Sequence, residues 1–475
     1  MIRKIIFWLS CLLLFFLPLQ TRWVYEAGNL NGGFFEYGTM SLYATEILAW
    51  LIIFLSFIAR LRDRDERARI FSGKYFRERW PRLVYFFVGL LLVGFLVARS
   101  LDFWVSYQYV TRLLGVVCVA IVIAQLAGAG GGRKLLIAFW AGGVAQGILA
   151  IVQFLSQNAF KIKGLGMAPH SASQIGDFVL EIGSGRWLRA YGNFGSPNSL
   201  GIYLAVALVA GLILLFYQRQ DNEKNIATQL GSEDSSHSPA CRQARFGMTT
   251  QKIVWLTAGQ LVILSGLVFS FSRGAWIAAL VGLASLVILS LACRQAGVSE
   301  RSFCHNYRIL ARQFLYYFIL VSILITIFSP LFFSRFDLSN RLEAHSFTER
   351  VNQISVSYKL SAQNLFFGVG PGVYTQAIYM MRPDLPVWSY QPVHNIYMLL
   401  VVEWGVGVFL LSLWALGRGV ILVWKNNRIF LPVILVVLVA GLFDHWIMSM
   451  WSGLLLTGVV GGLRICHSER SPKEA

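Results

Sequence analysis

The stretch SLGIYLAVALVAGLILLFY, residues 199–217, contains no charged side chain. Its length falls within the roughly 17–25 apolar residues that a helix needs to cross the ~30 Å hydrocarbon core of a bilayer. The stretch therefore predicts a membrane-spanning helix rather than a short periodic element of a soluble fold.

Similar apolar runs recur along the whole chain. The 475 residues are 56% hydrophobic and 13% charged, whereas soluble proteins carry roughly a quarter charged residues. The last two runs, at 430–444 and 446–463, are short and can form a single re-entrant pair. We predict one all-α polytopic membrane domain over residues 1–475, with candidate spans near 4–20, 41–59, 83–98, 107–127, 135–156, 199–217, 253–271, 274–292, 314–333, 394–417, 430–444 and 446–463.

The distribution of basic residues predicts the orientation. With the N-terminus inside, and the first span read as an uncleaved helix, the inner segments hold 28 of the 41 Lys and Arg residues, as the positive-inside rule requires. The basic run at 60–82 resembles a nucleic-acid-binding patch, but an inner loop facing anionic lipid explains it, and we expect no nucleic-acid partner. Both termini are then cytoplasmic.

Three loops stand out in this topology. Residues 157–198 form a first long outer loop, and residues 334–393 form a larger one before the tenth span. The inner segment 218–252 is a polar, Ser-rich cytoplasmic insert whose composition predicts disorder.

The larger outer loop contains a helical pattern. SFTE at 346–349 is typical of a capping box. Phe347, Val351, Ile354 and Tyr358 follow on one helical face. We predict an amphipathic helix over 347–363 that lies against the outer membrane surface.

Three outer arginines have the most informative contexts. Arg189 begins RAYGNFGSPNSLGIYL, which also holds Asn198; Arg273 lies in the tight outer turn of FSFSRGAW; Arg350 lies on the expected amphipathic helix. A guanidinium binds phosphate oxygens in bidentate, charge-assisted pairs. A single arginine can equally be an interfacial anchor, and the sequence does not show whether the three converge.

His394, in QPVHNIYMLLVVEWG (391–405), is the strongest candidate for a general base. Imidazole titrates near neutral pH, and a helix N-terminus disfavours its protonated form. The neighbouring Asn395 can orient a substrate or cap the helix. Glu403 lies about two and a half turns further on, on the opposite face, so we expect it to have a structural partner elsewhere in the bundle.

Further polar or flexible positions are possible substrate contacts. GVGPG at 368–372, with Gly370 and Gly372, is either a backbone nest for an anion or a simple turn. Asp444 and His445 form a polar pair at an outer span junction. His170 is isolated in the sequence, and the spacing of His, Cys, Asp and Glu indicates no metal site and no cofactor.

Four segments together resemble the O-antigen ligase-like membrane proteins, the Wzy_C superfamily. They are RAYGNFGSPNSLGIYLAV, FSFSRGAWIAALVG, ERVNQISVSYKLSAQNLFFGVGPGVY and PVHNIYMLLVVEWGVGVFLL, in this order within residues 185–460. The resemblance implies a twelve-span bundle of the GT-C type. It also implies a metal-independent, inverting glycosyltransferase at the outer face of the cytoplasmic membrane.

The same resemblance implies roles for the site residues. His394 would activate the acceptor hydroxyl, and Arg189, Arg273 and Arg350 would bind the pyrophosphate of an undecaprenyl-pyrophosphate-linked glycan donor. The acceptor would be a glycan or a lipid-linked glycan, which leaves ligase, polymerase and protein glycosyltransferase open. A transporter or flippase is the alternative, although its polar residues would be expected near the midplane.

Overall fold

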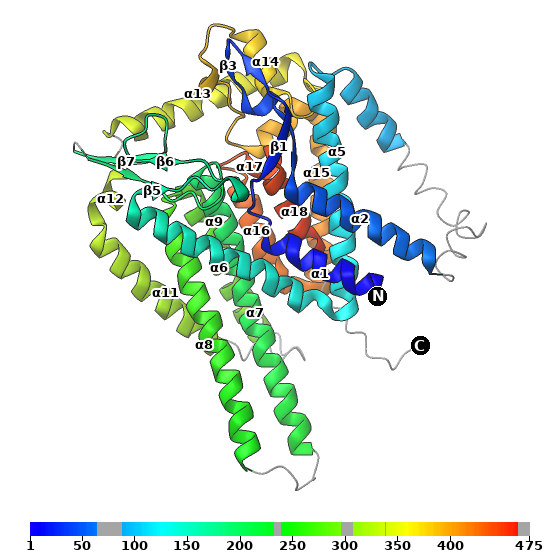
Figure 1. The fold of residues 1–475 in the computed structure, drawn as a ribbon, viewed down its shortest axis with the longest axis vertical. Coiled ribbons are helices and arrows are strands. Elements are labelled where there is room, and N and C mark those ends of the chain that lie inside the picture. The colour runs from blue at the N-terminus through cyan, green and yellow to red at the C-terminus, as the bar shows by residue number, and fades with distance from the viewer. Residues whose placement is uncertain (64–87, 184, 232–238, 296–306, 338, 464–475) are drawn as a thin grey trace.

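The computed structural model describes residues 1–63, 88–183, 185–231, 239–295, 307–337 and 339–463. Most of them are helical (Figure 1). The helices are α1 (Ile2–Phe15), α2 (Ala44–Arg62), a helix at Val88–Ala98, α5 (Phe103–Leu126), α6 (Gly132–Ser156), α7 (Pro197–Gly231), α8 (Pro239–Phe269), α9 (Arg273–Gln295), α11 (Tyr307–Ile327), α12 (Ser329–Ser334), α13 (Arg341–Gln363), α14 (Tyr374–Met381), α15 (Ile396–Asn427), α16 (Leu431–Ala440), α17 (Trp446–Ser449) and α18 (Trp451–Leu463).

Seven helical stretches among the described residues are long and apolar enough to cross a membrane. One of them, Phe103–Ser156, contains α5 and α6, which meet at a kink over Ala127–Gly131. Three shorter apolar helices accompany them, at Val88–Ala98, Arg428–Ala440 and Trp451–Leu463. The chain is therefore a mainly helical, multi-pass membrane protein.

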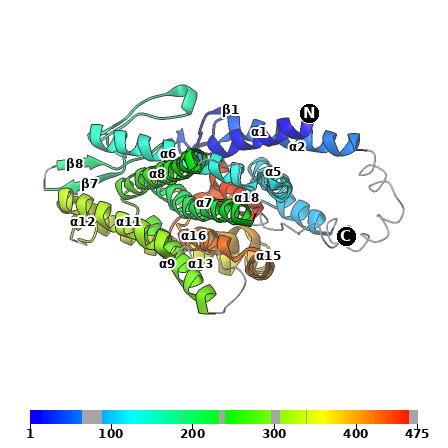
Figure 2. The ribbon, with the colours of Figure 1, turned by 90° about the horizontal axis from the view of Figure 1, so that it is seen from below.

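The 199–217 stretch lies in the middle of the helical bundle. It belongs to α7, whose window Pro197–Phe216 is completely buried inside the protein. Helices α6, α8, α9 and α16 pack around it (Figure 2). Neighbouring helices rather than lipid cover this segment on all sides. This burial explains why every face of the helix is apolar.

The polar insert is more ordered than its composition predicts. Helices α7 and α8 extend beyond the other helices, at the end of the bundle opposite α13 and α14 (Figure 1). The expected disorder is wrong for residues 218–231 and 239–252, which are helical, because extending an existing helix costs far less than nucleating a new one. Residues 232–238, and the basic segment from residue 64 to 82, lie outside the described residues.

Short strands form much of the loop structure near α13 and α14 (Figure 1). They have two to five residues each, too few for a clear alternation in the sequence. Four antiparallel pairs form: β1 (Arg22–Glu26) with β4 (Met40–Tyr43), β2 (Asn29–Leu30) with β3 (Gly33–Phe34), β5 (Asn158–Ala159) with β6 (His170–Ser171), and β7 (Val179–Ile182) with β8 (Gly185–Leu188).

Helix α13 corresponds to the expected amphipathic helix but begins six residues earlier, at Arg341. The side chain of Asn340 caps it by accepting from the backbone N–H of Leu342 at 3.0 Å, so SFTE lies inside the helix and is not its cap. The apolar face points out of the protein, with Phe347 62% and Tyr358 72% exposed. The polar face, including Glu343 and Gln353, is buried.

The turn at 368–372 packs against an interruption in α15. Gly405 has a φ of 78°, and a Cβ there would lie 2.2 Å from the carbonyl oxygen of Phe366. Next to this break, the backbone N–H groups of Val369 and Gly370 donate to the carbonyls of Val402 and Glu403, at 2.9 and 3.1 Å. The long tenth span is therefore not a continuous helix, and it receives the turn at its break.

Candidate active site

Three arginines line one small pocket at the end of the bundle near α13. We call it the arginine pocket: Arg273 begins α9, Arg335 follows α12, and Arg350 projects from α13. Asn198 and Asp444 complete its polar wall. Gly274 and Ala275, from the first turn of α9, also line the pocket, so the positive end of that helix adds to the arginine charges.

Glu343 holds two of these arginines together. Its carboxylate forms an ion pair with Arg273, 2.9 Å from the guanidinium, and a second ion pair with Arg335. Arg273 also donates to the backbone carbonyl of Arg335 at 2.7 Å. Burial lowers the pKa of Arg335 to about 10, while Glu343 raises it, so the side chain remains charged at neutral pH.

Arg350 differs from the other two arginines of the pocket in its contacts. Among the described residues its guanidinium makes no hydrogen bond or ion pair, although the charge of Asp444 acts on it. The pocket has a volume of ≈ 20 Å³, which is room for little more than one water molecule. A phosphate group can therefore enter only when a side chain moves outward, and moving Arg350 breaks no hydrogen bond.

Arg189 lies behind the arginine pocket. It is buried, and it donates to the carbonyl of Ser270 and to the Oδ1 atom of Asn198, both at 2.9 Å. Burial and the nearby charge of Arg335 lower its pKa. Arg189 thus orients Asn198, which lines the pocket, and does not line the pocket itself.

His394 lines a much larger space of ≈ 970 Å³, which we call the histidine cavity. The Oε1 atom of Gln353 accepts from both the backbone N–H of His394, at 3.3 Å, and its Nδ1, at 2.9 Å. A backbone N–H can only donate, so this oxygen is an acceptor and Nδ1 carries the proton. The lone pair of the neutral ring is then on Nε2.

Asp444 and His445 complete this part of the cavity. The His445 ring meets the His394 ring edge-on, with centroids 5.1 Å apart, and its Nδ1 lies 2.6 Å from the Ser449 hydroxyl. Burial lowers the pKa of His445 to about 4, so this ring is neutral at neutral pH. Asp444 and Asn198 each line both the arginine pocket and the histidine cavity, so the two spaces adjoin.

Asn395 caps a helix, and the GVGPG turn lies outside the arginine pocket and the histidine cavity, although Gly372 lines a third space described below. The Asn395 side chain accepts from the backbone N–H groups of Tyr397 and Met398, at 3.0 and 3.1 Å, as the N-cap of α15. Gly370 packs against Ser100, and neither Gly370 nor Gly372 lines the arginine pocket or the histidine cavity. Glu403 has the partner expected for it, because it accepts from the backbone N–H of Tyr374 just after this turn.

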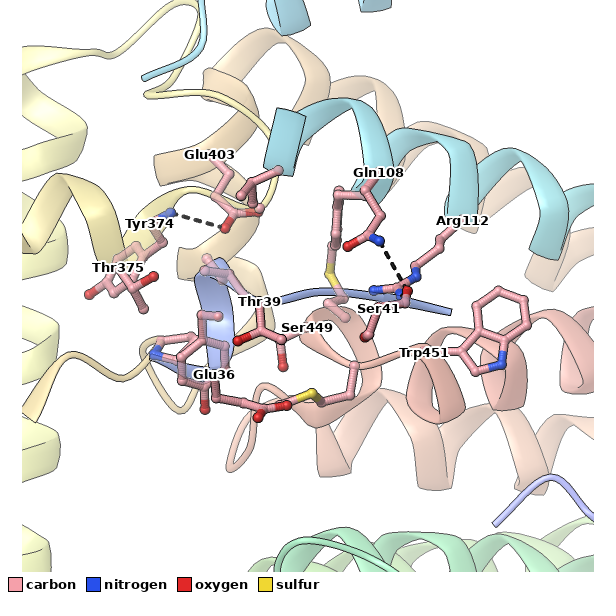
Figure 3. Close-up of a pocket in the computed structure, with 18 of the residues that line it drawn as sticks. Glu36, Thr39, Ser41, Gln108, Arg112, Tyr374, Thr375, Glu403, Ser449 and Trp451 are labelled. Carbon is pink, nitrogen blue, oxygen red and sulfur yellow. Dashed lines mark hydrogen bonds between the residues drawn. The ribbon is translucent and has the colours of Figure 1, made fainter. Parts of the chain in front are cut away.

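A third polar space, of ≈ 60 Å³, lies between the segment that connects α1 to α2, α5 and α15 (Figure 3). Glu36, Thr39 and Ser41 line it from the loop, and Gln108 and Arg112 from α5. It shares residues with the histidine cavity. The shared residues are Arg22, Glu36, Tyr37, Tyr43 and Met450.

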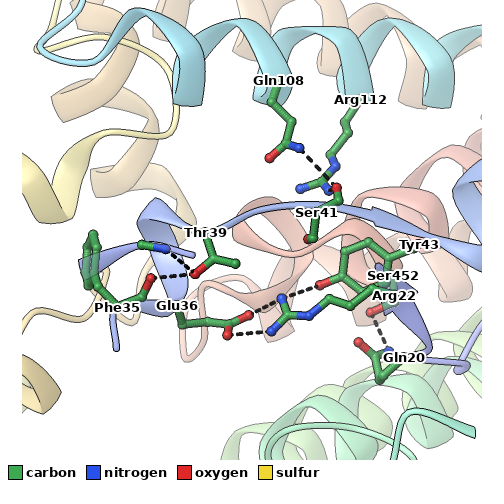
Figure 4. Close-up of polar contacts among 11 residues, drawn as sticks. Gln20, Arg22, Phe35, Glu36, Thr39, Ser41, Tyr43, Gln108, Arg112 and Ser452 are labelled. Carbon is green, nitrogen blue, oxygen red and sulfur yellow. Dashed lines mark hydrogen bonds and ion pairs between the residues drawn. The ribbon is translucent and has the colours of Figure 1, made fainter. Parts of the chain in front are cut away.

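An ion pair in this shared wall joins two parts of the segment between α1 and α2. Arg22 donates to both oxygens of Glu36, at 2.6 and 2.7 Å, and to the Tyr43 hydroxyl at 3.3 Å (Figure 4). Bidentate pairs of this kind have a defined geometry. The first hundred residues, in which the sequence indicated no site residue, therefore supply part of the wall of the histidine cavity.

Sequence reasoning missed four residues of these sites. Arg335 was one of several outer arginines without a distinguishing context. Gln353 looked like an ordinary polar position of the expected helix over 347–363, and Glu343 precedes that range. Glu343 and Gln353 are buried on the inner face of α13, and the sequence alone carries no sign of this burial. His170, which looked isolated, lines the histidine cavity and lies 2.6 Å from Asp177.

Comparison with known families covers the central part of these sites. Residues 258–415 match the family model Wzy_C, O-antigen ligase. The resemblance to O-antigen ligase-like proteins is thereby confirmed over these residues. Comparison with curated proteins gives no match.

The Wzy_C match contains the three arginines of the arginine pocket and His394 with its partner Gln353. Arg273, Arg335, Arg350, Gln353 and His394 all fall within it. It implies an enzyme of the ligase or glycosyltransferase type, acting on lipid-linked glycans in O-antigen biosynthesis. Residues that lie outside the match, namely Arg189, Asn198, Asp444 and His445, join the site through the fold.

The ion pairs of Glu343 make a testable contribution to stability. Glu343→Gln leaves Arg273 and Arg335 without their counter-charge in a largely buried site. We expect it to destabilise the protein by about 3 kcal/mol, the low end for a broken buried pair because Arg273 is 30% exposed. Thermal unfolding in detergent measures the change.

Asp384→Asn is the matched control, because Asp384 pairs with Arg382 on the surface, where the two side chains are 64% and 57% exposed. Solvent screens such a pair, so this variant should unfold near the wild-type temperature. Equal unfolding temperatures for the two variants would show that Glu343 does not hold the arginine pocket together.

Proposed function

We propose that this protein is a metal-independent, inverting glycosyltransferase of the O-antigen ligase or polymerase type. It transfers a glycan from undecaprenyl pyrophosphate to an acceptor hydroxyl. The observation that carries the proposal is the junction of the arginine pocket with the histidine cavity at Asn198 and Asp444. Groups suited to a leaving pyrophosphate and a group suited to accept a proton thus face adjoining spaces.

The arginine pocket supplies what the leaving group needs. When the acceptor oxygen attacks C1 of the donor sugar, the bond from C1 to the pyrophosphate oxygen breaks and negative charge develops on that oxygen. Arg189, Arg273, Arg335 and Arg350 outnumber Glu343, Glu349 and Asp444 around the pocket, so the local charge is positive. Preorganised positive charge stabilises the transition state most where charge develops.

His394 supplies the base. Its Nε2 lone pair accepts the proton of the acceptor hydroxyl as the new C1–O bond forms. Gln353 holds the ring in the required tautomer through Nδ1. Unlike a carboxylate, the Gln353 amide adds no negative charge that would favour the imidazolium, so the ring remains neutral and ready to accept.

The proposed setting is the outer face of the cytoplasmic membrane. A bundle of twelve spans of the GT-C type, with cytoplasmic termini, places the arginine pocket and the histidine cavity on the side that carries few basic loops. The polyprenyl chain of the donor then lies in the bilayer beside the site, and the acceptor reaches the cavity from the outer side.

The acceptor and the flippase alternative are open to direct measurement. In a deletion strain, accumulated single repeats mark a polymerase, accumulated full-length polymer marks a ligase, and an unglycosylated protein marks a protein glycosyltransferase. Lipid-linked glycan retained on the inner face would instead mark a flippase. The adjoining base and arginine sites favour transfer, because a flippase needs no base beside its phosphate site.

The first prediction concerns His394. Purified protein should transfer glycan from undecaprenyl pyrophosphate to acceptor, and His394→Ala should lower the rate about 10²–10⁴-fold, the usual contribution of a positioned base. Chromatography of the glycan products measures transfer. The variant should still bind donor, which separates loss of the base from loss of the fold; normal turnover would remove His394 from the mechanism.

The second prediction concerns Arg350. Arg350→Lys keeps the charge but replaces the planar fork with a single ammonium group. We expect a higher KM for the donor and an unchanged KM for the acceptor in the transfer assay. Arg341→Lys is the control, since Arg341 is 80% exposed and pairs with Glu181 outside the pocket. Unchanged donor use by Arg350→Lys would make Arg350 an interfacial anchor.

The third prediction is a pH profile. Burial lowers the pKa of His394, the Asp444 charge raises it, and the Arg350 charge lowers it. Because the neutral ring is the base, kcat/KM should fall as the pH drops through a value below the ordinary ~6.5 of imidazole. Asp444→Asn should move this acid limb to lower pH and Arg350→Gln to higher pH. Shifts in the opposite directions would show that another group is the base.

A further inference from the structure

A second histidine faces the histidine cavity, and the chemistry described above does not use it. His170 lies on β6, and its Nδ1 is 2.6 Å from the Oδ1 atom of Asp177. The other oxygen of Asp177 accepts from the backbone N–H of Ser171 at 2.8 Å. The Asp177 side chain is only 6% exposed, so protein groups rather than solvent determine its position.

The His170 ring is held in a single orientation. It stacks on the ring of Tyr191 with centroids 4.0 Å apart and an angle of 9° between the planes. Tyr191 is itself buried, and its hydroxyl accepts from the backbone N–H of Phe178 at 2.7 Å. Rotating the imidazole would break both the stacking contact and the bond to Asp177, so the ring is preorganised.

The hydrogen bond to Asp177 determines what His170 offers to a ligand. The Asp177 oxygen accepts the hydrogen bond at Nδ1, so Nδ1 carries a proton and Nε2 is the ring nitrogen left for a ligand. That nitrogen can accept a hydrogen bond from a hydroxyl group. When the ring is charged, Nε2 can instead donate to the oxygen of the same hydroxyl group, whereas a phosphate or carboxylate is repelled by the negative charge of Asp177.

The position of His170 indicates which substrate it meets. It lies on the same outer loop as Arg189 and Asn198, and Asn198 lines the arginine pocket. His394, the proposed base for the acceptor, lies on a different segment of the cavity wall. The volume of ≈ 970 Å³ is at the upper end of the roughly 300–1,000 Å³ of small-molecule sites, which leaves room for several sugar rings.

We propose that His170, oriented by Asp177 and Tyr191, forms a hydrogen bond through Nε2 with a sugar hydroxyl of the donor glycan and so forms a glycan-binding subsite. This inference rests on the proposed donor, a glycan on polyprenyl pyrophosphate. It adds a contact to the sugar itself, separate from the arginines that face the pyrophosphate.

Two substitutions of His170 separate binding from structure. In His170→Asn the short amide can still donate to Asp177 but no longer reaches the cavity. In His170→Gln the longer amide places an oxygen near the position of Nε2 but abandons Asp177. If His170 has only a structural role, His170→Asn should disturb the protein less than His170→Gln. If His170 binds the glycan, His170→Gln should weaken glycan binding less than His170→Asn.

The experiment compares two ligands on the full-length protein in detergent. Undecaprenyl pyrophosphate with and without its attached glycan is titrated against wild type, His170→Asn and His170→Gln by intrinsic fluorescence. For His170→Asn we expect about two- to tenfold weaker binding of the glycan-bearing lipid, the effect of one neutral hydrogen bond, and unchanged binding of the bare lipid. His170→Gln should retain most of the difference between the two ligands.

The outcomes are distinguishable. Both affinities are measured on one preparation of each variant. Partial unfolding therefore lowers the apparent binding of both lipids alike and leaves the ratio of the affinities unchanged. An unchanged ratio in His170→Asn, or a ratio lost only in His170→Gln, would overturn the glycan subsite. Failure of wild type to bind either lipid would instead overturn the proposed donor.

Discussion

One buried carboxylate organises the charged part of this molecule. Glu343 pairs with Arg273 at the start of α9 and with Arg335 after α12, and it lies on the inner face of α13. Isolated buried arginines would repel one another and lose their hydration, so they remain together only because a shared counter-charge offsets this cost. The pairing also fixes the position of α13, and with it Arg350 and Gln353.

In this arrangement the polar and apolar faces of α13 are oriented opposite to those of a surface helix in a soluble protein. Its polar face points into the protein and its apolar face points outward, where Phe347 and Tyr358 are exposed. Helical periodicity predicted the apolar face correctly, but it does not say which face meets protein and which meets lipid. That assignment matters for function, because the inward polar face places Arg350 in the wall of the arginine pocket. The same face brings Glu343 to Arg273 and Arg335 and Gln353 to His394.

Several elements could be predicted from the sequence for clear physical reasons. Apolar runs and the bias of basic residues predict a multi-pass helical protein, since both follow from the cost of placing charge in a bilayer. Predictions that relied on local pattern alone were weaker. SFTE matches a capping box but lies within a helix that Asn340 already caps, and the polar insert extends two existing helices. In each case the neighbouring structure outweighed the local preference.

The sequence by itself determined the class of protein, the outer placement of the arginines and His394 in the predicted topology, and the resemblance to O-antigen ligases. These properties follow from residue type and order along one chain. Only the tertiary structure decided that Arg273, Arg335 and Arg350 share a pocket, that Gln353 orients His394, that Asn395 is a cap, and that His170 faces the same cavity. Apart from the local Asn395 cap, each of these contacts joins segments far apart in the chain, and residue order carries no measure of the distance between them once the chain is folded.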